Sequence, residues 1–242
     1  MTDSTPRIEV TIAAPVDTVW NALRDKETIR HWHGWEYEGL AEEIDLIYFT
    51  EVKENAETRE LNMEAGDLIR LEAVDGGTRV TLTRPPRGTN PDWDAYYTDI
   101  TEGWITFLHQ LRFAIERQSG APRRTLFFAG SNESGRSVVD ELGLPAGSTV
   151  DLGLLGEQVK GEVWFRSEHQ VGITVDAWGD GLLVVSGIEP TDDKPEGVAM
   201  AVLSTYGLDD DRLAELNDRW SPWWAERFPA NEYPTDQTFT QD

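Results

Sequence analysis

The sequence predicts an α+β protein in which a curved antiparallel sheet wraps around one long C-terminal helix, in two tandem copies of which the second has diverged. Three observations predict it. In the first half a short apolar strand, short helices, further strands and a long Trp-bearing helix follow one another. The same order recurs in the second half, as a pattern without sequence identity. Gly120-Ala121-Pro122 separates the halves and is typical of a linker.

The first half opens with a strand and two short helices. Apolar and polar residues alternate over Ile8–Ala13, which is typical of a half-buried strand. Pro15 fits the start of a helix, where its missing N–H costs nothing. From Val16 onward apolar residues recur at helical spacing, so one face of this helix should be buried. We expect a second short helix over Glu27–Trp32.

Further strands and a long helix complete the first half. Strands are predicted over Ile44–Glu51, Asp67–Ala73 and Thr78–Arg84. The last two are joined by Asp75-Gly76-Gly77, a hairpin signal, and whether Thr58–Met63 adds another strand stays open. The long helix is predicted over Thr101–Gln118. Its apolar stripe consists of Trp104, Leu108, Leu111 and Ile115, with Phe107 beside it.

The second half repeats the order with departures. Strands are predicted over Thr125–Ala129, Val159–Phe165, Val171–Trp178, Leu182–Ile188 and Val198–Tyr206, with Val150–Leu155 as a further candidate. One helix is expected over Ser134–Leu142 and a closing one over Asp209–Phe228, which Pro222 should kink or restart. We expect domains over residues 1–120 and 123–230, then a polar tail over 231–242. The alternative is that the later strands extend the first sheet.

Composition excludes several classes of function. Each half of the 242-residue chain is long enough to bury a core, and no apolar run approaches the ~18 residues of a membrane span. The absence of Cys excludes disulfides and thiolate chemistry and favours the cytoplasm. The net charge of −24, without a basic face, disfavours nucleic acid and anionic membranes as partners. Acidity of this kind keeps a protein soluble, and a basic protein partner stays open.

Three segments carry a family resemblance over about residues 7–119. They are IEVTIAAPVDTVWNALRDKETIRHW, GGTRVTLTRP and EGWITFLHQLRFAIE. In their order they resemble the helix-grip (SRPBCC) superfamily of START and Bet v 1 proteins, and within it the branch of the Hsp90 ATPase activator Aha1. The resemblance implies that the sheet wraps the long helix and that two small helices close one end. It also implies a cavity for an apolar ligand between helix and sheet.

Aromatic residues give the strongest local signal for a site. The residues predicted to line the cavity are Trp20, Trp32, Trp35, Phe49, Trp104, Phe107, Leu108 and Leu111. The alternative is core packing, because a Trp at helical spacing usually packs and satisfies its N–H. In the closing helix, Trp220, Trp223 and Trp224 spread over neighbouring faces. At least one of them should therefore meet the other domain or solvent.

Titratable residues give a weaker signal. His31 and His33 form an HxH pair, the spacing that puts two side chains on one strand face, but nothing nearby completes a tetrahedral metal set. We expect them at the surface or a pocket rim, and we expect His109 to face solvent or to be satisfied. No GxSxG, Walker, GxGxxG or HExxH motif is present. The sequence therefore predicts no metal, no cofactor and no assigned catalytic residue.

Three functions remain. Non-catalytic binding of a small apolar or aromatic ligand is favoured, since the implied cavity is concave and apolar. The second is a protein-interaction module, like an Hsp90 co-chaperone, and a homodimer stays open. The third is an enzyme resembling the helix-grip cyclases and aromatases, although the sequence supplies no convergent acid–base pair. The candidate pocket acids and bases are Arg70, Glu72, Tyr48, His33 and His109.

Overall fold

The computed structural model describes residues 6–63, 66–90, 94, 96–118, 120–132, 144–154, 157–191 and 194–229, without the side chains of 152–159. The chain divides into two compact units. The first comprises Met1–Thr125, Trp178–Leu182 and Ser204–Gly207, and the second comprises Leu126–Ala177, Leu183–Leu203 and Leu208–Asp242. Two separate antiparallel sheets are each followed by a long helix, so the predicted α+β class is confirmed and the later strands do not extend the first sheet.

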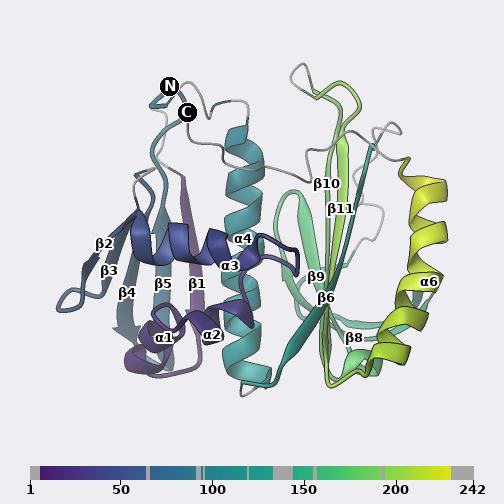
Figure 1. Cartoon of the computed structure of the whole chain (residues 1–242), viewed down its shortest axis with the longest axis horizontal. Coiled ribbons are helices and arrows are strands. Elements are labelled where there is room, and N and C mark those ends of the chain that lie inside the picture. The colour runs from purple at the N-terminus through teal and green to yellow at the C-terminus, as the bar shows by residue number, and fades with distance from the viewer. Residues whose placement is uncertain are drawn as a thin grey trace. The chain divides into compact units, whose positions relative to one another are not determined.

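The first sheet has five strands in the order β1-β5-β4-β3-β2 (Figure 1). The strands are β1 (Arg7–Ile12), β2 (Val52–Asn55), β3 (Glu60–Met63), β4 (Leu68–Val74) and β5 (Gly77–Thr83). All neighbours pair antiparallel. The predicted β4–β5 hairpin is confirmed. Gly77 is required there, because a Cβ on it would lie 2.1 Å from the carbonyl oxygen of Ile12.

Short helices lie between β1 and β2 in the sequence. They are α1 (Val16–Ala22), α2 (Lys26–Arg30), α3 (Leu40–Asp45) and a π-helical turn over Leu46–Thr50. The N-terminus of α2 is capped by Asp25, whose carboxylate accepts a hydrogen bond from the backbone N–H of Thr28. Figure 1 shows α1 and α2 together at one end of the sheet, as the resemblance implied.

The predicted strand over Ile44–Glu51 is wrong. The segment is helical, first as the end of α3 and then as the π-helical turn. The reason is burial: Leu40, Ile44 and Tyr48 are four residues apart, and all three are at most 4% exposed. The run Ile47-Tyr48-Phe49 has the residue types that strands favour, so local composition suggested a strand that tertiary packing overrides.

The long helix of the first unit is α4 (Tyr97–Phe113), continued by a π-helical turn over Ala114–Gln118. It begins earlier than the sequence predicted. Trp104, Leu108 and Leu111 belong to one buried cluster with apolar residues of β1, β3, β4 and β5. The sheet therefore holds α4 by its apolar stripe, which is the predicted helix-grip arrangement. Among the described helices, none is long and apolar enough to cross a membrane.

The second sheet has six strands in the order β6-β11-β10-β9-β8-β7. The strands are β6 (Arg123–Gly130), β7 (Thr149–Leu154), β8 (Glu157–Arg166), β9 (Gln170–Val175), β10 (Gly181–Ile188) and β11 (Val198–Tyr206). These bounds confirm the predicted strand series, except that the strand predicted to reach Trp178 ends at Val175 and is followed by a 3-10 helix over Asp176–Trp178. The helix predicted over Ser134–Leu142 and the tail 231–242 lie outside the described residues.

The closing helix α6 (Asp210–Arg227) runs unbroken through Pro222, so the predicted restart at that residue does not occur. Packing on both sides of the proline stabilises the helix. Trp220 and Trp224 are buried, and their rings lie 5.9 and 6.0 Å from the ring of Phe128 on β6. Trp223 is only half-buried, and the guanidinium of Arg227 lies 4.2 Å from its ring. One of the three tryptophans thus reaches solvent, as the sequence predicted.

Candidate functional site

Four side chains of the first unit form a hydrogen-bonded chain that runs from the core to the surface. The hydroxyl of Tyr48 lies 3.0 Å from Nδ1 of His33. Nε2 of His33 lies 3.4 Å from Oε1 of Glu43. The hydroxyl of Tyr37 donates to Oε2 of Glu43 at 2.6 Å. Tyr48 and His33 have no exposed surface, whereas Tyr37 is 44% exposed. We call these four residues the polar chain.

The segment that was predicted as a strand and is helical in the structure positions the polar chain. Glu43 lies on α3 and Tyr48 on the π-helical turn that continues it. Single π-helical turns occur frequently at functional sites. His33 and Tyr37 follow the end of α2 at His31. The two segments therefore bring together residues separated by 6, 10 and 15 positions in the sequence.

The protonation states of the chain follow from its contacts. Burial raises the pKa of Glu43, but the hydrogen bond and charge of His33 and the hydrogen bond of Tyr37 outweigh it and hold that pKa below its usual value. The carboxylate of Glu43 therefore accepts a hydrogen bond from Nε2 of His33. Burial, and then Glu43, raises the pKa of both phenols, so both keep their protons at neutral pH.

Aromatic rings enclose His33 on several sides. The ring of Phe107 lies 4.4 Å from the imidazole, between centroids. Those of Tyr48, Trp32 and Trp104 follow at 5.2, 5.7 and 6.5 Å, in edge-on arrangements. This geometry is the one aromatic pairs prefer. The interior between α4 and the sheet is consequently occupied by the protein's own side chains.

Several residues predicted to line a cavity are solid core in this structure. Trp32, Leu108 and Leu111 are 0% exposed, so they touch neither solvent nor a void large enough for water. Trp20 and Trp104 are 5% and 6% exposed. Nε1 of Trp32 donates to the carbonyl oxygen of Ala22 at 3.0 Å. Ligand binding by these residues stays a prediction, and it would require the core to open.

The remaining predicted residues, Trp35, Phe49 and Phe107, are half-buried. Phe49 lies beneath two cations, since Arg24 and Lys26 are 4.8 and 4.9 Å from its ring. Cations over a half-exposed ring indicate a surface contact. Phe107 touches the polar chain, through His33. The predicted set is therefore divided between core and surface.

Trp104 joins a second buried polar group. Its Nε1 donates to Oδ2 of Asp67 at 2.9 Å, and Nε of Arg84 donates to Oδ1 at 3.2 Å. Arg84 also donates to the carbonyl oxygen of Tyr97 and to the hydroxyl of Thr101 on α4. Burial raises the pKa of Asp67, although Arg84 and Trp104 oppose that shift. This network fixes the first turns of α4 to the sheet.

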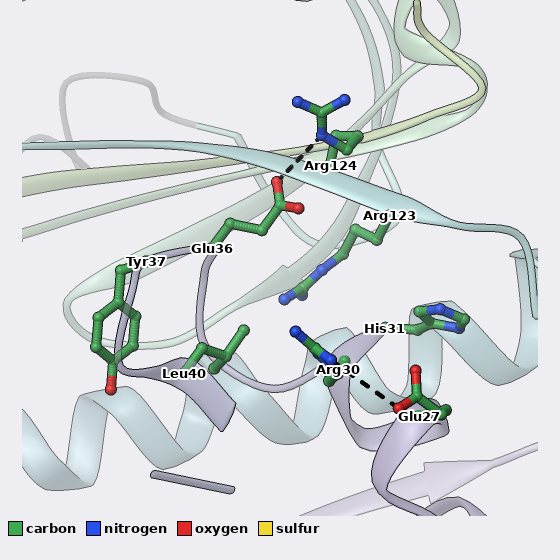
Figure 2. Close-up of a pocket in the computed structure, with 8 residues that line it drawn as sticks. All are labelled: Glu27, Arg30, His31, Glu36, Tyr37, Leu40, Arg123 and Arg124. Carbon is green, nitrogen blue, oxygen red and sulfur yellow. Dashed lines mark ion pairs between the residues drawn. The ribbon is translucent and has the colours of Figure 1, made fainter. Parts of the chain in front are cut away.

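An open pocket of about 520 Å³ lies elsewhere in the first unit, at the end of α2 and the start of β6 (Figure 2). It is lined by Glu27, Arg30, His31, Glu36, Tyr37, Leu40, Arg123 and Arg124. Figure 2 shows the guanidinium groups of Arg30 and Arg123 turned toward the same space. Three arginines face two glutamates here, a local reversal of sign in a chain of net charge −24.

Arg123 forms the base of this pocket and is only 5% exposed. Its guanidinium donates to the carbonyl oxygens of Trp32, His33 and Gly34 at 3.0, 2.7 and 3.1 Å. It also donates to Oε1 of Gln110 on α4 at 3.3 Å. Burial lowers the pKa of Arg123, against the influence of Tyr206 and Glu36. Arg123 thus fixes the backbone that carries His33.

The contacts explain why the sequence predicted neither the buried position of His33 nor the pocket. His31 ends α2 and His33 is fully buried, so the two do not share a strand face, and the expected surface position of His33 is wrong. Tyr48 and His33 converge, although the sequence offered no convergent pair. The one available signal for the pocket was the Arg123-Arg124 pair directly after the presumed linker of an acidic chain.

Other titratable candidates lie apart from the pocket. Arg70 and Glu72 are exposed residues of β4, and their ion pairs are with Glu60 and Arg79. His109 is half-buried on α4, where burial and the charge of Arg112 lower its pKa to about 3. Within the described part of the chain, no three His, Asp or Glu side chains are grouped as metal ligands.

Comparison with known proteins gives little further guidance. No protein-family model matches the chain, and no curated protein matches it. Among solved structures, the DynU16 protein of the dynemicin biosynthetic locus is 17% identical, with a TM-score of 0.35 over 92% of this chain and 95% of that one. The di-domain ARO/CYC proteins StfQ (steffimycin pathway) and BexL (BE-7585A pathway) are 12% and 10% identical, each with a TM-score of 0.34. They cover 92% and 93% of this chain, and 92% and 99% of their own.

At these TM-scores the likeness carries no argument about this chain, whose fold and site rest on the geometry described above. The narrower resemblance to the Aha1 branch gains no support from a matching family model.

The core position of Trp104 leads to a first prediction. Trp104→Ala should lower the free energy of unfolding by ~3–5 kcal/mol, because a buried ring is lost. Trp104→Phe keeps a ring but leaves Oδ2 of Asp67 without its indole donor, so it should cost ~1–3 kcal/mol. Urea unfolding measures both. A loss below ~1 kcal/mol for the alanine variant, with intact folding, would show that Trp104 lines an open space.

The polar chain leads to a second prediction, on pH. Since the pKa of Glu43 is lowered on folding from 4.5, its contribution to stability is present above about pH 4.5 and is lost as pH falls through the folded value. Glu43→Gln should therefore destabilise the protein at neutral pH and lose most of that effect in acid. Urea unfolding of both proteins across this range tests it. An equal difference at every pH would contradict the ionised state of Glu43.

Proposed function

We propose that the first unit binds a small organic molecule in the pocket between α2 and the start of β6, without transforming it. The observation that carries this proposal is the pocket itself. Its volume of about 520 Å³ falls within the range of small-molecule sites, whereas Trp32 and Leu108, at the centre of the expected cavity, touch no void. Convergent charged groups on one wall are typical of sites that orient a ligand.

The pocket offers two kinds of contact. Tyr37 and Leu40 supply apolar surface, and the ring of Tyr37 suits a planar ligand. Arg30 and Arg123 supply charge. This combination supports the small aromatic ligand that the sequence favoured, but at another place in the unit. An apolar ligand beneath α4, a protein partner and a homodimer stay predictions, for which no contact described here gives specific support.

Proton-transfer catalysis is a second candidate, favoured by the polar chain alone. The chain ends at the hydroxyl of Tyr37, and Tyr37 is the one member that also lines the pocket, so it is the member that a bound ligand would touch. Glu43 and His33 behind it would return a proton to that hydroxyl. This is the class of function that the resemblance to helix-grip cyclases and aromatases implied.

The binding proposal is tested by titrating the full chain with naphthoate and with naphthamide while amide resonances are followed by NMR. Saturable shifts should appear at residues 27–40 and 123–125, because those segments form the pocket. Shifts centred on α4 would instead place the ligand in the core. Failure of both compounds to saturate any resonance at millimolar concentration would overturn the proposal.

The second candidate has a direct assay. α-Tetralone in D₂O exchanges its α-protons for deuterium when a base removes one proton and an acid returns a deuteron. If Tyr37 serves this purpose, the protein should accelerate exchange at least ~10-fold over buffer, and Tyr37→Phe should abolish the gain while keeping the ring. NMR integration of the α-protons gives the rate. No acceleration by the native protein would exclude this reaction.

A further inference from the structure

We infer that the pocket selects its ligand by a carboxylate group, which binds between the buried guanidinium of Arg123 and the exposed guanidinium of Arg30. This inference rests on the proposed function and names the class of ligand that the same site takes: a planar or aromatic monocarboxylate.

Arg123 is a buried cation held only by neutral oxygens. Its four hydrogen bonds go to three backbone carbonyls and to the amide of Gln110. In the part of the chain that the structure describes, no carboxylate lies within ion-pair distance of it. Removing a cation from water costs several kcal/mol unless it is paired, and carbonyl dipoles offset only part of that cost. An anionic ligand in the pocket would offset the remaining cost of burying the charge of Arg123.

The nearest acid of the pocket is held elsewhere. The carboxylate of Glu36 accepts a hydrogen bond from the backbone N–H of Thr125 at 2.8 Å. The backbone N–H of Glu36 donates to the hydroxyl of Thr125 at 2.6 Å. Glu36 also lies 3.5 Å from Nε of Arg124. These contacts tie Glu36 to β6, so it forms no ion pair with Arg123, although its charge still acts on that guanidinium.

Arg30 supplies the second guanidinium of the proposed carboxylate site. Its side chain is half-exposed, and Glu27 lies 3.9 Å away, well beyond the 2.7–2.9 Å of a charge-assisted hydrogen bond. A guanidinium is a planar fork that matches a carboxylate with two parallel bonds. The guanidinium groups of Arg123 and Arg30 are turned toward the same space, so a carboxylate there would meet positive charge on two sides (Figure 2).

The rest of the lining narrows the class of ligand. Glu27 and Glu36 at the rim would repel a multiply charged phosphate, whereas a single carboxylate needs only the two cations. Tyr37 and Leu40 offer a wall for the body of the ligand. The long-range field of a chain with net charge −24 disfavours anions, so recognition has to come from contacts at the site.

The test compares naphthoate with naphthamide, which has nearly the same shape without the charge. Calorimetric titration of the full chain should show naphthoate binding at least ~10-fold more tightly, the usual scale of one charge-assisted contact. Arg30→Gln should remove most of that preference. Arg79→Gln is the matched control, because Arg79 is a similarly exposed arginine that pairs with Glu72 on the sheet, outside the pocket.

The outcomes separate the two proposals. Equal affinity for acid and amide, or an unchanged preference in Arg30→Gln, would overturn carboxylate selection while leaving small-molecule binding intact. Binding of neither compound would overturn both. Since Arg123 fixes the backbone of His33, its replacement is avoided, and a loss of preference in Arg79→Gln would also count against the inference as an effect of net charge.

Discussion

The candidate site depends on the hydrogen bonds that Arg123 donates to three consecutive backbone carbonyls. A guanidinium donates from a rigid plane, so it fixes the orientation of every peptide group it bonds. The peptide of His33 is the central one of the three. With that backbone fixed, the imidazole meets Tyr48 on one nitrogen and Glu43 on the other.

In the first unit, buried polar groups pack directly against aromatic rings. His33 lies among the rings of Phe107 and Trp32, yet both its nitrogens are satisfied. Trp104 is likewise packed on one side and bonded to Asp67 on the other. Fully satisfied polar groups of this kind give a core one preferred arrangement. A rigid interior of this sort leaves recognition to the surface pocket.

Regular patterns predicted most of the fold, and contacts distant in sequence explain what they missed. Alternation located β1, β4, β5 and most of the second sheet, and helical spacing located α4. The residue types of Ile44–Glu51 are compatible with a strand and with a helix. Burial at four-residue intervals, seen only in the folded unit, favours the helix. Arg123 could not be assigned from the sequence, because its partners lie about 90 residues earlier and its burial exists only in the folded unit.

The start of β6 supplies cations to the pocket from outside the sequence that forms the apolar cluster. Every residue of the apolar cluster around α4 lies between Ile8 and Ile115. The cations at the base of the pocket, Arg123 and Arg124, come after that stretch and after the turn at Gly120. The proposed pocket therefore takes residues from both stretches, and Leu40 belongs to the pocket and to the apolar cluster alike. Arg123 also holds the backbone of His33, whereas a substitution at Arg124 changes the charge of the pocket while the apolar cluster keeps its composition.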